Sequence, residues 1–129
     1  MAKTLMRGRR GFTLIEMLVV LAIVALLLTL AAPRYFSSID ASKEAVLRDN
    51  LRTVRTTLEQ FYADNARYPK DLDELVERKY LRALPVDPFV ESTSAWQILP
   101  PAANVSGDVY DIKSSASGST RDGMPLSEL

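Results

Sequence analysis

A single carboxylate, Glu16, lies within the stretch 12–32, where the only other polar residues are Thr13 and Thr29. A carboxylate at the centre of a membrane helix costs on the order of 2.5–3.5 kcal/mol, and less near the edge, so such residues usually have a partner. The spacing points to a positive charge at Phe12, about one helical turn before Glu16. Cleavage between Gly11 and Phe12 would create that charge as a new α-amino group.

Gly11 suits such a cleavage, because glycine has no side chain to block the approach of a protease to the backbone. The chemistry predicted here is cleavage by another protein, followed by pairing of an amine with a carboxylate. The chain has no cysteine and no histidine, which removes thiolate nucleophiles and the commonest general base. No other set of residues predicts catalysis, so we expect no enzymatic activity.

The element that must position Phe12 and Glu16 is a helix. Over residues 12–32 such a helix would be roughly 30 Å long, which matches the hydrocarbon core of a bilayer. Basic residues precede it without any acid among them and should stay cytoplasmic, which places the rest of the chain outside. They are Lys3, Arg7, Arg9 and Arg10. After residues 1–11, 12 basic side chains are interspersed with 16 acidic ones, a pattern that argues against binding of nucleic acid.

Two simpler interpretations of this segment remain open. A cleavable signal peptide could be cut near Ala31 or Ala32, but the apolar stretch is longer than the usual apolar region of such peptides and contains Glu16. A plain single-pass anchor would make Glu16 an accident near the end of the helix.

The run from Arg10 to Glu16, RGFTLIE, resembles the processing signal of type IV pilins and type II secretion pseudopilins, and Pro33 matches the proline of their long helix. The resemblance implies that a prepilin peptidase cuts after Gly11 and N-methylates Phe12. It also implies that Glu16 neutralises the Phe12 amine of a neighbouring subunit during assembly. Because proline lacks an N–H, we expect either a kink or melted turn around 28–32, which would serve assembly, or simply the end of the membrane helix.

Beyond the apolar stretch, residues 35–62 contain no glycine or proline, and apolar residues recur every three or four positions, as on one face of a helix. A short helix is expected from Lys70 or Asp71 to Tyr80, and strands at 95–99 and 109–113. The sequence therefore predicts an α+β fold: a long N-terminal helix, half membrane-spanning and half amphipathic, packed on a small domain with a short helix and a two- or three-stranded antiparallel sheet. The expected divisions are a cytoplasmic leader, a polymerisation helix, an amphipathic half and a periplasmic globular region, at 1–11, 12–34, 35–62 and 63–129.

The segment 61–89, with its Tyr68-Pro69 and the Leu-Pro-x-Asp-Pro at 84–88, resembles type II secretion pseudopilins more than adhesive type IV pilins. The lack of a cysteine pair favours the same family, because many type IV pilins close a loop with a disulfide. The resemblance implies a major or minor subunit of a pseudopilus that drives protein export. The alternatives are a type IV pilin for adhesion, motility or DNA uptake, and a membrane-anchored periplasmic module that never polymerises.

The resemblance also implies partners and a location. The expected partners are further copies of the chain in a helical filament, the prepilin peptidase, other pseudopilins and the inner-membrane assembly platform. The chain would cross the bacterial inner membrane once, with its N-terminus cytoplasmic and its C-terminal domain periplasmic.

Calcium is the one ion that the sequence suggests, and no cofactor is otherwise required. Oxygen-rich loops with glycine suit calcium, and major pseudopilins bind it in the corresponding loop. The implied ligands are Asp108, Asp111, Ser114 and Asp122. The chain departs from the family pattern, because a Ser-rich run at 114–120 replaces the Gly-x-Asp-Gly stretch. The alternative is a solvated loop whose polar side chains cap its own backbone.

Mass spectrometry of the membrane-extracted protein tests the processing site. We expect a mature N-terminus at Phe12 carrying one methyl group, because the motif directs both reactions to that residue. An intact N-terminus, or one that follows Ala31 or Ala32, would contradict the pilin-type interpretation.

Overall fold

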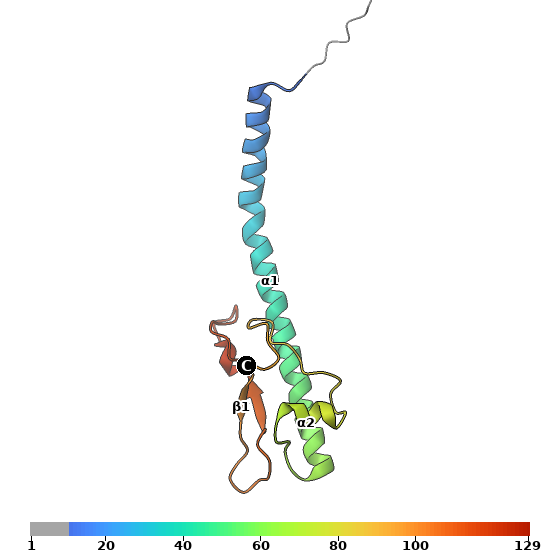
Figure 1. Ribbon diagram of the computed structural model, residues 1–129. Helices are drawn as coiled ribbons and strands as arrows, with labels where there is room; N and C mark the ends of the chain where they lie inside the picture. The colour runs from blue at the N-terminus through green and yellow to red at the C-terminus, as the bar shows by residue number, and fades with distance from the viewer. Residues whose placement is uncertain (1–10) are drawn as a thin grey trace, which may run out of the picture. The chain divides into compact units, whose positions relative to one another are not determined.

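The computed structural model describes residues 11–129, so the predicted leader lies outside the described residues except for Gly11. Two helices and two strands follow one another, with a short 3₁₀-helix at Leu126–Glu128 (Figure 1). They are α1 (Leu14–Asn65), α2 (Leu72–Glu77), β1 (Gln97–Leu99) and β2 (Asp111–Lys113). The chain divides into two compact units, Met1–Ser38 and Ile39–Leu129. These elements confirm the predicted α+β class.

The part of α1 in the first unit is long and apolar enough to cross a membrane. Its large apolar side chains from Leu14 to Leu30 are 40–81% exposed. Exposed apolar surface of this extent marks a site that lipid or other proteins cover. A helix suits that setting because all its central backbone groups bond within the segment.

The helix continues through Pro33 without interruption. The melted turn expected at 28–32 is therefore absent, and α1 itself does not end at the proline. Proline removes one backbone donor, while every neighbouring residue still gains from continuing an existing helix. Thr29 adds a local bond, since its hydroxyl donates to the carbonyl of Ala25 at 2.8 Å.

In the second unit, one stripe of α1 supplies half of the hydrophobic core. The buried positions recur at alternating spacings of four and three, as expected for a helix with a single covered face. They are Leu47, Leu51, Val54, Leu58 and Phe61, none more than 1% exposed. The predicted stripe was broader, because Val46 and Tyr62 remain 48% and 40% exposed.

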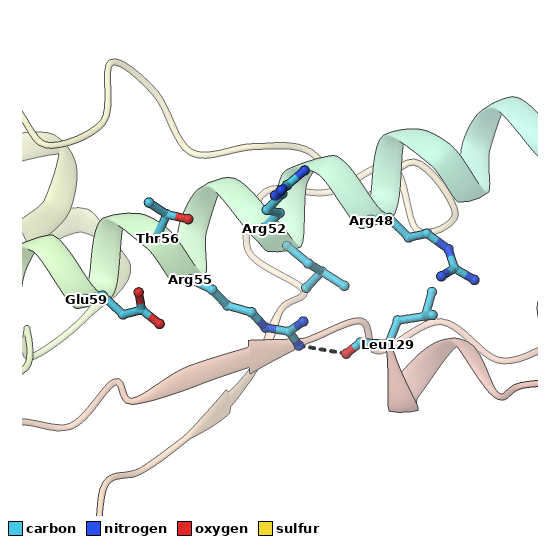
Figure 2. Close-up of a pocket in the computed structure, with 7 residues that line it drawn as sticks. Arg48, Arg52, Arg55, Thr56, Glu59 and Leu129 are labelled. Atoms are coloured by element: carbon cyan, nitrogen blue, oxygen red, sulfur yellow. Dashed lines mark hydrogen bonds between the residues drawn. The ribbon is translucent and has the colours of Figure 1, made fainter.

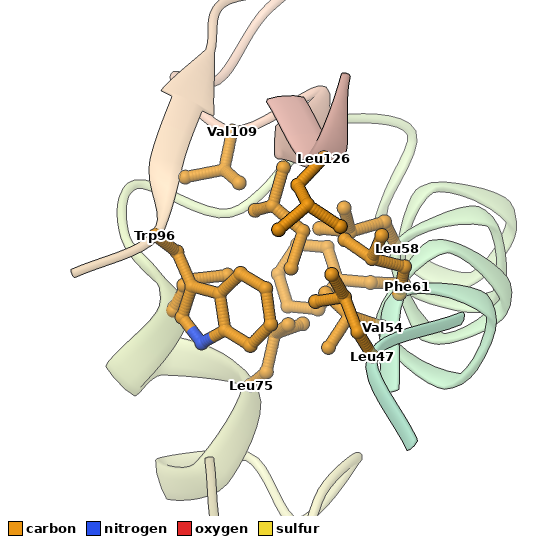
Figure 3. Packing of buried hydrophobic residues seen from close by; sticks show 11 residues of the cluster. Leu47, Val54, Leu58, Phe61, Leu75, Trp96, Val109 and Leu126 are labelled. Carbon is orange, nitrogen blue, oxygen red and sulfur yellow. The ribbon is translucent and has the colours of Figure 1, made fainter. Parts of the chain in front are cut away.

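The rest of the chain covers this stripe (Figure 3). The other core residues come from α2, from the strands and their flanks, and from the 3₁₀-helix; they are Leu72, Leu75, Trp96, Val109, Ile112 and Leu126. The Trp96 ring nitrogen donates to the carbonyl of Pro85 at 3.0 Å. Trp96 is buried to 6% exposure, and its bond to Pro85 satisfies the polar atom of a side chain that is otherwise apolar.

The sheet has two antiparallel strands, in which Ile98 lies opposite Ile112. Both strands are shorter than predicted, as is α2, which ends at Glu77 because Lys79 has a φ of 64°. The loop between the strands is tied to the end of α1. Gly107, with a φ of 109°, approaches Tyr68 so closely that a Cβ there would lie 2.3 Å from the Tyr68 oxygen. Only glycine fits both constraints.

Substitution of Leu58 by alanine tests the core. Loss of a buried leucine side chain leaves a cavity, so we expect a loss of about 2–5 kcal/mol in the free energy of unfolding. Fluorescence of Trp96, the single tryptophan of the chain, follows the transition. Val46→Ala on the same helix should cost far less, because Val46 is half exposed. Equal losses in the two variants would contradict this assignment of the buried face.

Candidate processing and assembly site

The start of α1 is fixed by Thr13. Its hydroxyl accepts a bond from the backbone N–H of Glu16 at 3.2 Å, and its carbonyl accepts from Met17 at 3.2 Å. This is the N-cap arrangement, which satisfies a donor that the first turn of a helix leaves without a partner. The sequence analysis missed this role, although threonine followed three residues later by glutamate is the pattern of a capping box.

Gly11 and Phe12 lie just before the helix and are exposed, Phe12 to 80%. No heavy atom lies within 4 Å of the position that a Cβ on Gly11 would take. The bond between the two residues is therefore in a non-helical, open segment. A protease can reach it without unwinding α1.

Glu16 is exposed on the first turns of the helix. Its carboxylate makes no hydrogen bond or ion pair with any of residues 11–129. It lines a shallow groove with apolar neighbours from the same face, namely Phe12, Ile15, Val19 and Val20. The structure thus brings Phe12 and Glu16 together on one face, and the carboxylate has no partner in the part of the chain that the structure describes.

Pro33, the other predicted assembly residue, lies in the same helix. It follows Glu16 by 17 positions, which corresponds to roughly 25 Å along the helix axis. The two residues therefore do not form one site. A part played by Pro33 in assembly stays a prediction.

The four residues implied as calcium ligands are not gathered into an acidic cluster. Asp111 accepts a bond from Arg55 at 2.8 Å, and the buried Ser114 donates to Asp87. Asp108 and Asp122 are exposed. Within residues 11–129, no group of three or more acidic, cysteine or histidine side chains could hold a metal ion. The arrangement does not fit calcium at these positions, and the ion has no support beyond the resemblance.

Asp87 is a residue whose role the sequence analysis missed. It is fully buried and accepts from the backbone N–H of Phe89 at 2.9 Å and from the Ser114 hydroxyl. It therefore closes its own loop and ties that loop to the end of β2. The signal was present in the Leu-Pro-x-Asp-Pro run, since aspartate commonly bonds to backbone two residues later in a turn.

A charged cluster joins the end of α1 to α2. Arg67 and Arg78 both contact the Glu74 carboxylate, with nearest separations of 2.5 and 3.3 Å. The Lys70 N–H donates to Glu74 at 2.8 Å, and Asp71 caps the helix. The bond from Arg67 is the main cause that lowers the pKa of Glu74 from 4.5 to about 2.

Comparison with known proteins gives one match to the N-terminal segment and several matches over most of the chain. The family described as the prokaryotic N-terminal methylation motif matches residues 6–32. Type II secretion system core protein G of Pseudomonas aeruginosa is 30% identical over 122 residues, which cover 82% of this chain and 84% of that protein. The protein of the same name from Klebsiella pneumoniae is 28% identical, over 83% of this chain and 86% of its own.

A type IV pilin is also similar, over a shorter region. The type IV major pilin protein PilA of Myxococcus xanthus is 33% identical over 66 residues, which cover 51% of this chain and 30% of the pilin. No solved structure matches the chain significantly.

The acid stability of the domain tests the Glu74 cluster. Because the pKa of Glu74 is lowered to about 2 in the folded state, its contribution is complete above pH 4.5 and is lost as the pH falls toward 2. Glu74→Gln should lower the melting temperature at neutral pH and flatten its decline over that window. Glu77→Gln on the same helix is the control. A decline that is equally steep in Glu74→Gln would contradict the assignment.

Proposed function

Since the chain belongs to the family of type II secretion system core protein G, the major pseudopilin, we propose that it is the structural subunit of a pseudopilus. A prepilin peptidase removes residues 1–11, and the mature subunits assemble through α1 into a periplasmic filament. Growth of that filament drives the export of proteins.

One observation carries the proposal: Glu16 is exposed on the apolar face of α1, one turn after the Gly11–Phe12 bond, and has no partner among residues 11–129. Cleavage gives every subunit both an amine at Phe12 and a carboxylate at Glu16. In a low-dielectric environment each charge is costly alone and strongly attracted to the other. Pairing between subunits compensates both charges. Because the amine and the carboxylate meet in only one register of neighbouring helices, the same interaction favours assembly and aligns the subunits.

The exposed apolar surface of α1 supports a membrane-embedded precursor. The basic residues before Gly11 favour a cytoplasmic N-terminus, and so a periplasmic domain. In this orientation the cut is made at the cytoplasmic face. The partners that follow are the peptidase, further copies of the chain, other pseudopilins and the inner-membrane assembly platform.

A type IV pilin is the second candidate, because the Myxococcus xanthus pilin is similar over about half of this chain. That match covers 51% of this chain, whereas the matches to core protein G cover 82% and 83% of it. The broader match therefore favours the pseudopilus.

Replacement of Glu16 by alanine tests the proposal in cells that carry the secretion system. Insertion and cleavage should continue, while filament assembly and export of secreted proteins should fall about tenfold or more, because the Phe12 amine loses its partner. Thr29→Ala, a polar-to-apolar change in the same helix, should leave both unchanged. Normal filaments from Glu16→Ala would refute the pairing. Loss of surface pili with normal export would instead identify a type IV pilin.

A further inference from the structure

We propose that Arg55 takes the place of a metal ion in this chain, holding the segment 114–129 against α1, so that the folded domain does not depend on calcium. The inference concerns the stability of the second unit alone. It goes beyond the proposed function, and its failure would leave that proposal unaffected.

The Arg55 side chain reaches from α1 into a set of oxygens from the end of the chain (Figure 2). Its Nε donates to a carboxylate oxygen of Asp111 at 2.8 Å. Its Nη2 donates to the backbone oxygens of Ile112 and Leu129, at 3.1 and 2.7 Å. One carboxylate and two backbone oxygens are the ligand types that calcium takes. Here a guanidinium binds them, with its planar donors aimed at fixed points.

The segment after β2 needs such an attachment, because it has little regular structure. Within it, the Thr120 carbonyl accepts from the N–H of Gly123, and the N–H of Leu126 donates to the Gly118 carbonyl. These turns connect only residues of the segment with one another. Its attachment to the remainder of the fold depends on a limited set of contacts, which include the Arg121 N–H donating to Glu44 of α1 at 3.3 Å and the Ser114 hydroxyl donating to Asp87. Burial of Leu126 to 2% exposure is another of them, and the bond between Arg55 and Leu129 lies a short way beyond it.

Two of the four implied ligands, Asp111 and Ser114, already have partners within the fold. Asp111 accepts a second bond, from the N–H of Ile112 at 2.7 Å. Ser114 donates to Asp87 and accepts from Ala116. Across residues 11–129, every buried side-chain nitrogen or oxygen has a hydrogen-bond partner. A divalent ion at Asp111 would also lie beside the positive guanidinium, which opposes its binding.

A matched pair of arginines on one helix makes the inference testable. Arg52 is three residues before Arg55 and lines the same groove. Figure 2 shows Arg52 pointing away from Leu129, whereas Arg55 points toward it. Arg52 makes no ion pair with another residue of the described part of the chain. The two side chains therefore have the same chemistry and differ in whether they hold the segment.

The experiment is thermal unfolding of the full mature chain in detergent, followed by Trp96 fluorescence, with excess calcium chloride or with a chelator. The wild-type melting temperature should be the same in both conditions, because no ion binds the folded state. Arg55→Met should lower it by roughly 5–15 °C, since three bonds from a charged group are lost. Arg52→Met should leave it unchanged.

Arg55→Lys adds a second test, because lysine keeps the charge but not the fork of donors. It should recover only part of the loss, as expected if geometry matters as well as charge. A wild-type melting temperature that rises with calcium and falls with the chelator would overturn the inference. An unchanged melting temperature for Arg55→Met would overturn it as well.

Discussion

The rest of the structure depends on which apolar side chains of α1 are buried and which are exposed. In the second unit, one stripe of the helix is sealed by the chain itself, down to 0–1% exposure at Leu47 and Leu58. In the described part of the first unit, the large apolar side chains from Leu14 to Leu30 remain 40–81% exposed. A subunit built this way is stable only when something else supplies that cover, first a bilayer and then neighbouring helices. Assembly would exchange one apolar environment for another, and this is why the proposed function gives polar groups such as Glu16 the part of directing it.

The polar groups of the second unit have a different role: they hold segments without regular secondary structure in place. The sheet is small, and two short strands are marginal by themselves. Buried or partly buried side chains compensate by bonding to backbone at chosen points, as Asp87 and Arg55 do. Such bonds are strong when complete and costly when broken, because the groups are shielded from water. The domain therefore depends on a few side chains more than on its regular elements.

Much of this could be predicted from the sequence, because the strongest signals are local. The apolar run, Glu16 within it and the three-four spacing after Tyr35 predicted α1 and its packed face. The roles of Asp87 and Arg55 were not predicted, since each depends on a partner 27 to 74 residues away. The calcium ligands illustrate the same limit. Asp111 looks available in sequence, yet an arginine 56 positions earlier binds it.

Thr13 has a consequence for the maturation of the subunit. It lies after the predicted cut, so the side chain that begins α1 stays with the mature protein. The bond from the Glu16 N–H to the Thr13 hydroxyl is therefore kept when residues 1–11 are removed. Cleavage at the predicted bond would then change the net charge of the subunit while the first turn of α1 keeps its cap. Maturation in this sense adds a charged amine at the start of a helix that has already formed.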